Sequence, residues 1–145
     1  MINRENGLLE IYERIKANRS GIGVLSFKRT PTAPIQEEDM PCIFMLEGTD
    51  NIIKYSSRGN TGYPVKRALE VTLEIVTNKE ADIKTIYRKL RQYVFTSRVS
   101  GKFDSRVANN SFIHESRTDG PTGYGLPDIL GMSLILDLVY VDNDL

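Results

Sequence analysis

Several residue types on which common activities depend are scarce or missing in this chain. It has no tryptophan, one cysteine and one histidine, and its 19 lysines and arginines are balanced by 19 aspartates and glutamates. A single cysteine, Cys42, excludes an internal disulfide and any zinc site built from several cysteines. A single histidine, His114, excludes a metal site built on a histidine pair. The balanced charge is also atypical of globally basic nucleic-acid-binding proteins.

Long apolar runs are missing as well. No segment approaches the roughly 20 apolar residues that a membrane-spanning helix requires. Residues 1–6 lack the apolar core of a signal peptide. We therefore expect no membrane partner and a reducing, soluble compartment. A length of 145 residues suits a single domain, residues 1–145, that buries a real core.

The clearest pattern that is present covers residues 65–95. Apolar and polar residues alternate from Val65 to Thr77, which predicts a strand with one buried face. Beyond Asn78, the expected N-cap, the apolar period becomes three or four, which predicts an amphipathic helix over about residues 82–95. The stripe on that helix consists of Ile83, Ile86, Tyr87, Leu90 and Val94. A helix that directly follows the strand can cover the strand's apolar face.

The N-terminal segment predicts another amphipathic helix. Asn3 or Asn6 is the expected N-cap, the helix should run to about Asn18, and Gly21 offers a left-handed residue at its end. The residues expected to face the core are Leu8, Ile11, Tyr12 and Ile15. The residues expected to face solvent are Glu10, Glu13, Arg14 and Lys16.

Shorter patterns predict the remaining strands. They lie at residues 23–28, 42–46, 51–55, 111–116 and 131–140. The wholly apolar segment 42–46 follows Pro41 and fits a strand covered on both sides. The polar, glycine-rich segment 56–64 is the expected tip of a long hairpin that returns along Val65–Thr77. Together the patterns indicate an α+β domain, with a mixed or antiparallel sheet, a long hairpin and two helices packed on one face.

Reactive groups do not converge in the sequence. His114 lies in a predicted strand and Cys42 in an apolar run, so a surface histidine and a packed thiol are the favoured interpretations. The glycine-rich segment 120–125 lacks the lysine and hydroxyl residue of a P-loop and is expected to be a connecting or interface loop. We expect no enzyme activity, no metal and no cofactor. Four residues leave a small metal-dependent nuclease as an alternative: Glu70, Glu74, Asp82 and Lys84.

Charge is divided along the chain. Basic residues gather in one stretch, opposed only by Asp104, and they are Lys84, Arg88, Lys89, Arg91, Arg98, Lys102 and Arg106. Acidic residues gather elsewhere, and they are Glu37, Glu38, Asp39, Glu47, Asp50, Asp142 and Asp144. The division predicts either solvated surfaces or a head-to-tail interface in which a basic side meets the acidic side of the next subunit.

The order of elements resembles that of the tail terminator, or tail completion, proteins of long-tailed bacteriophages and related contractile-tail particles. The shared pattern is a short N-terminal helix, an apolar strand after Pro41, a long hairpin over 51–77, a crossing helix and closing strands. The resemblance implies a structural virion protein that forms a ring, expected to be a hexamer. Such a ring caps the head-proximal end of the tail tube, ends its polymerisation and joins tail to head.

The resemblance also implies the partners and their site. These are further copies of the chain, the tail tube protein and a head connector or neck protein, while DNA passes through the lumen without specific binding. The location is the virion neck, after assembly in the host cytoplasm. The expected interface residues are Arg58, Asn60, Tyr63, Arg88, Arg91, Arg98, Lys102, Thr122 and Tyr124. Another neck protein, such as a head–tail connector or adaptor, and a monomeric ligand-binding domain remain alternatives.

Overall fold

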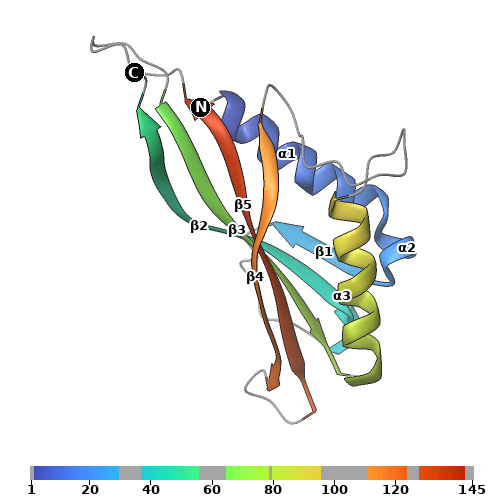
Figure 1. Ribbon diagram of the computed structural model, residues 1–145. Coiled ribbons are helices and arrows are strands. Elements are labelled where there is room, and N and C mark those ends of the chain that lie inside the picture. The colour runs from blue at the N-terminus through green and yellow to red at the C-terminus, as the bar shows by residue number, and fades with distance from the viewer. Residues whose placement is uncertain are drawn as a thin grey trace.

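A computed structural model describes residues 2–29, 37–55, 65–78, 80–95, 111–123 and 128–142. Figure 1 shows a twisted sheet with two substantial helices on one face. The elements in chain order are α1 (Ile2–Ala17), α2 (Arg19–Ile22), β1 (Ser26–Arg29), the 3-10 helix η1 (Glu37–Asp39), β2 (Cys42–Tyr55), β3 (Val65–Thr77), α3 (Glu80–Phe95), β4 (Phe112–Gly123) and β5 (Leu130–Asp142). The predicted α+β class is confirmed.

The sheet is mixed and has five strands in the order β1-β2-β3-β5-β4. β1 runs parallel to β2, and every other neighbouring pair is antiparallel. β2 and β3 form the predicted long hairpin, paired from Cys42 opposite Val76 to Tyr55 opposite Val65. The order places β1 and β4 at opposite edges of the sheet, so each has one side without a partner strand among the described elements.

The core lies between the sheet and the two long helices, α1 and α3 (Figure 1). The predicted inward residues of β3 are fully buried, and they are Leu69, Val71, Leu73 and Ile75. Directly opposite them on β5 lie Leu138, Leu136, Leu134 and Met132. The helices cover this surface with Leu8, Ile11 and Ile15 from α1 and with Ile83, Ile86, Leu90 and Val94 from α3. Burial of each such side chain contributes roughly 1.5–3 kcal/mol.

The opposite face of the sheet is polar along β3 and apolar at one end. Glu70, Thr72 and Glu74 alternate with the core residues and are half-buried. A second apolar cluster is formed by Met40, Cys42, Phe44, Val76 and Ile129. This cluster lies across the start of β2 from Ile43 and Met45, so the predicted coverage of this segment on both sides is confirmed for residues 42–45.

Three predicted strand boundaries were wrong. The strand expected at 23–28 begins only at Ser26, as β1, because Gly23 still caps α2. The strands expected at 42–46 and 51–55 are one strand, β2, because register shifts between Glu47 and Asp50 and between Ile52 and Lys54 absorb the extra residues. β4 continues to Gly123, through part of the expected glycine-rich loop, because its backbone stays paired with β5. A register shift between Asp119 and Thr122 makes this possible.

The N-terminal helix also differs from the prediction. α1 begins at Ile2, so Asn3 lies inside the helix, and its side-chain amide donates to the Val141 oxygen at 2.7 Å. Asn6 is likewise inside the helix, and neither asparagine is a cap. The left-handed residue is Gly23, with a φ of 96°, because the chain makes the extra short helix α2 before turning into β1. No helix in the described ranges is long and apolar enough to cross a membrane.

Candidate functional site

Only part of the expected interface is described by the structure. Arg88 and Arg91 lie one turn apart on α3, and Thr122 lies near the end of β4. The other expected residues lie outside the described residues, and they are Arg58, Asn60, Tyr63, Arg98, Lys102 and Tyr124. The structure therefore brings Arg88 and Arg91 together and places Thr122 elsewhere, opposite Gly131.

The two arginines line a pocket between α3 and β4, which we call the α3–β4 pocket. Its cavity volume is about 370 Å³, and its lining residues are Tyr87, Arg88, Arg91, Gln92 and Glu115. Four of these residues lie on two successive turns of α3, and Glu115 lies on the edge strand β4. The aromatic ring of Tyr87 and the aliphatic parts of the longer side chains give the pocket apolar walls, with charged groups at their ends.

Glu115 is fully paired within this pocket. Arg91 donates from Nε and Nη2 to Glu115 Oε2, at 3.0 and 2.7 Å. The hydroxyls of Tyr87 and Thr118 each lie 3.2 Å from Glu115 Oε1 and also contact each other, so their two hydrogens are shared among these three contacts. The hydrogen bond from Arg91 lowers the pKa of Glu115, and the same bond raises the pKa of Arg91. The carboxylate thus neutralises Arg91, while Arg88 has no counter-charge among the residues that the structure describes.

Arg88 belongs to an exposed basic face of α3. Its side chain makes no hydrogen bond or ion pair with the described residues, and Lys84 and Lys89 beside it are also exposed. The basic residues predicted between 84 and 106 are therefore exposed where they lie on α3. Its continuation at residues 96–110 lies outside the described residues.

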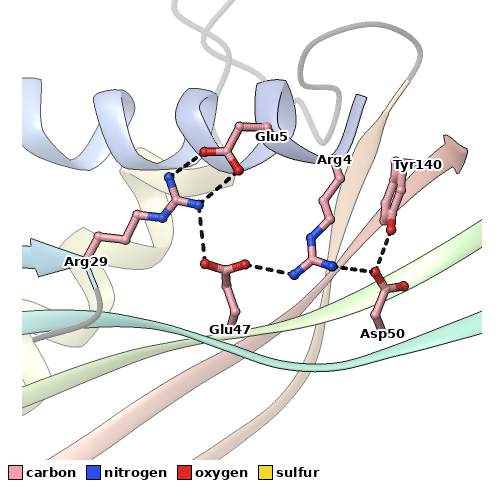
Figure 2. Close-up of polar contacts among 6 residues, drawn as sticks. All are labelled: Arg4, Glu5, Arg29, Glu47, Asp50 and Tyr140. Atoms are coloured by element: carbon pink, nitrogen blue, oxygen red, sulfur yellow. Dashed lines mark hydrogen bonds and ion pairs between the residues drawn. The ribbon is translucent and has the colours of Figure 1, made fainter. Parts of the chain in front are cut away.

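Glu47 and Asp50, expected on the acidic side of the interface, pair within their own chain. Figure 2 shows Arg4 between the two carboxylates, 2.9 Å from Glu47 and 3.0 Å from Asp50. Arg29 in turn contacts Glu5 at 2.8 Å and Glu47 at 3.3 Å. Both carboxylates thus have a cation beside them within their own chain, because α1 supplies Arg4 and β1 supplies Arg29. Asp142 is likewise paired with Arg67, at 3.1 Å.

Tyr140 adds a neutral hydroxyl to this group of paired charges, on the helix side of the sheet. Its hydroxyl donates to Asp50 Oδ2, while the other carboxylate oxygen, Oδ1, is buried without a hydrogen-bond partner in the described part of the chain (Figure 2). Burial and the bond to Asp50 raise the pKa of Tyr140 far above its ordinary value. The group therefore fastens α1 to β1, β2 and β5 and is structural.

Two further acidic residues lie near the β1 edge of the sheet, which also carries the exposed Lys28. Glu38 is exposed and Asp39 half-buried, and the Asp39 backbone oxygen accepts a hydrogen bond from Ser26 Oγ at 3.0 Å. Leu25 lies beside them, because its N–H donates to the Pro41 oxygen at 2.8 Å, and 65% of its surface is exposed. We call Leu25, Glu38 and Asp39 the β1-edge patch. Sequence patterns missed Leu25, since a leucine in a short predicted strand is ordinarily buried.

The residues of the nuclease alternative are separated by the sheet. Glu70 and Glu74 lie on the polar face of β3, and Glu70 is 3.6 Å from Arg117. Asp82 and Lys84 lie at the start of α3, on the helix-covered face. The described residues contain no group of three or more histidine, cysteine or acidic side chains that could hold a metal ion. His114 is exposed, 3.7 Å from Asp137, and Cys42 is a buried free thiol.

No family model and no curated protein match the chain. Among solved structures, the chain is similar to a chain of a structure described as the virion of a native gene transfer agent (GTA) particle. The likeness covers 92% of this chain and 93% of the other, with a TM-score of 0.56 and 10% sequence identity. At that identity the likeness concerns the fold. The α+β fold of this chain thus also occurs in a chain of a virion particle.

Proposed function

We propose that the protein is a structural subunit of a phage-like particle and acts as its tail terminator. The observation that carries the proposal is the likeness in fold, over nearly the whole of both chains, to a chain of a gene transfer agent virion. The order of helix, hairpin, crossing helix and closing strands is also the order on which the resemblance to tail terminators depends.

The two unlike edges of the sheet suit a closed ring. The sheet ends in two different edge strands, β1 and β4, which carry different side chains. Contacts between two unlike edges are heterologous, and such contacts close into a ring when the rotation between neighbours permits. The expected hexamer would be one such ring. Its further partners would be the tail tube protein and a head connector, with DNA passing through the lumen without specific binding.

The proposed mechanism is stoichiometric capping and needs neither catalysis nor a cofactor. A ring stacked on the last ring of tube protein covers the surface to which the next tube ring would add. Growth therefore stops at that point, and the opposite face of the terminator ring becomes the surface that meets the head. This activity belongs to the neck of the virion and to particle assembly in the host cytoplasm.

The test combines imaging with binding. Negative-stain images of the purified protein should show a closed ring with a central hole, and the ring should bind isolated tail tube. Particles made without the protein should have tails of irregular, excessive length and no attached heads. A monomer at low salt and high concentration that binds no tail tube would contradict the proposal. Binding to the head connector alone would assign the protein to a different position in the neck.

A further inference from the structure

We propose that the α3–β4 pocket of one copy receives Leu25 of the next copy, with Glu38 of that copy facing Arg88. This inference rests on the proposed ring and names the contact that joins its subunits. It assigns the basic and the acidic side of the subunit to two described surfaces on opposite edges of the sheet.

The pocket combines an apolar cavity with a positive charge, the two features that a docking site for Leu25 and Glu38 requires. Its volume of about 370 Å³ has room for a leucine side chain, and its walls are the Tyr87 ring and the aliphatic stems of α3 residues. At its rim, Arg88 carries a charge that no described residue neutralises. Arg91 cannot serve in its place, because its Nε and Nη2 are bonded to Glu115. An apolar side chain with a carboxylate beside it would therefore complement the pocket.

The β1-edge patch has that composition. Leu25 is 65% exposed, the highest value among the large exposed apolar side chains of the described residues. Hydrogen bonds from the Leu25 N–H to Pro41 and from Ser26 Oγ to Asp39 hold it against the acidic turn. Because the backbone of this segment is already fixed, only the leucine side chain has to be ordered on docking, which lowers the entropy cost of using it as an anchor. Glu38 precedes Asp39 in the same short helix, η1, and is exposed, so its carboxylate is available to the same contact.

The charges also favour a head-to-tail contact, in which the pocket of one copy meets the β1-edge patch of the next. If two pockets met, Arg88 would face Arg88, and if two β1-edge patches met, Glu38 would face Glu38. Both arrangements bring like charges together, whereas pocket against patch brings opposite charges together. Because β1 and β4 lie at opposite edges of one sheet, each copy can use both surfaces at once, as a ring requires.

Cysteine cross-linking tests the contact directly. The variant with both Leu25→Cys and Gln92→Cys should form disulfides between copies on oxidation and give a ladder of covalent multimers on a denaturing gel. Each single variant should give no ladder. The matched control is Leu9→Cys with Gln92→Cys, because Leu9 is also exposed, at 43%, but lies on α1. The native Cys42 is buried and does not interfere.

Charge reversal supplies an independent test by native mass measurement. Arg88→Glu and Glu38→Arg should each shift the protein from ring to monomer, and the double variant should restore the ring. An equimolar mixture of the two single variants should also assemble, with the variants alternating around a ring of even number. Lys84→Glu, the same charge change one turn away on α3, should retain the ring.

The results separate this inference from the proposed function. A ring that persists in Arg88→Glu, together with no ladder from the double-cysteine variant, overturns the pocket contact and leaves the terminator proposal standing. A wild-type protein that is monomeric and does not bind tail tube overturns both. Circular dichroism of each variant establishes that the fold is retained, as expected for substitutions at exposed positions.

Discussion

Arg14 in α1 donates a hydrogen bond from Nη1 to the backbone oxygen of Val94, in the last turn of α3. The side chain of Arg14 is only about 10% exposed, although the helix pattern places it among solvent-facing residues. The oxygen is one of those at a helix end that lack a partner within the helix, and a cation there also interacts favourably with the helix dipole. This bond joins the two helices that cover the sheet.

Loss of this bond should destabilise the fold. Arg14→Met keeps most of the packing volume but leaves the Val94 oxygen without its partner, so the free energy of unfolding should fall by about 1–3 kcal/mol. Urea denaturation followed by circular dichroism measures the change. The control is Glu13→Gln at the neighbouring exposed position, which should alter stability by less than about 0.5 kcal/mol. Equal effects of the two substitutions would contradict the assigned role of Arg14.

The charged group in Figure 2 predicts that the fold loses stability when Arg4 is replaced. Arg4 bridges two carboxylates on β2, and Arg4→Met would leave both Glu47 and Asp50 without it. We expect a loss of about 1–3 kcal/mol, because Asp50 is largely buried and already has one oxygen without a partner in the described chain. Arg19→Met, at an exposed position on α2, should change stability little. Thermal unfolding measures the loss of stability in both variants. Equal losses in Arg4→Met and Arg19→Met would contradict the role assigned to Arg4.

The Arg91–Glu115 pair predicts a small dependence of stability on pH. The pKa of Glu115 lies below its ordinary value of 4.5, chiefly because Arg91 hydrogen-bonds the carboxylate. Its contribution is therefore present above pH 4.5 and is lost as the pH falls through the lower, folded-state pKa. The pair is partly exposed, so less than about 1 kcal/mol is involved.

Arg91→Gln should remove this dependence. The difference in unfolding free energy between wild type and variant should be constant near neutral pH and shrink as the solution becomes more acidic than pH 4.5. Lys84→Gln serves as the control, because Lys84 is exposed on the same helix and has no described partner, and its pH profile should follow that of the wild type. A difference that grew at low pH would be incompatible with a lowered pKa of Glu115.

Gly120 and Gly123 in β4 form a matched pair for testing the unexpected extension of this strand. Gly120 has a φ of 93°, and a Cβ added there would lie 2.7 Å from the Gly131 oxygen. Gly120→Ala should therefore destabilise the fold by about 1–3 kcal/mol. Gly123→Ala should change stability much less, since an added Cβ meets nothing within 4 Å. If denaturation showed the two substitutions to be equivalent, the strand would not continue through Gly120 as described.

Cys42 should be unreactive in the folded protein. Burial raises the pKa of its thiol to about 11, so little thiolate is present near neutral pH. A thiol reagent should modify it only as fast as the protein unfolds, and urea should accelerate the reaction. Leu25→Cys introduces an exposed thiol for comparison and should react immediately. Rapid modification of the wild type in buffer would contradict the burial of Cys42.

Local patterns were sufficient for the elements that form the centre of the fold. The strand Val65–Thr77 was predicted with its observed bounds, and the stripe of the following helix faces the core as expected. Both follow from burial of one face, which imposes a period of two on a strand and of about 3.6 on a helix. The α+β class, the hairpin and the placement of two helices on one face follow from the same periods.

Boundaries of the irregular strands did not follow from pattern. The register shifts in β2 and β4 let polar and glycine-rich segments remain in the ladder, and a ladder depends on the backbone of the neighbouring strand. Nothing in the residues 116–123 alone reports that β5 lies alongside them. The extension of β4 was therefore visible only once the sheet had been assembled.

The partners of charged residues likewise could not be predicted from the sequence, because they depend on the tertiary structure. Composition and spacing alone established an α+β domain with a divided charge, because these depend on which side chains can be buried and at what period. Whether Glu47 faces Arg4 or a neighbouring subunit, and whether Leu25 is covered or exposed, depends on which segments meet across the sheet. Those contacts join residues far apart in the chain, and the energy that selects them exists only in the folded molecule.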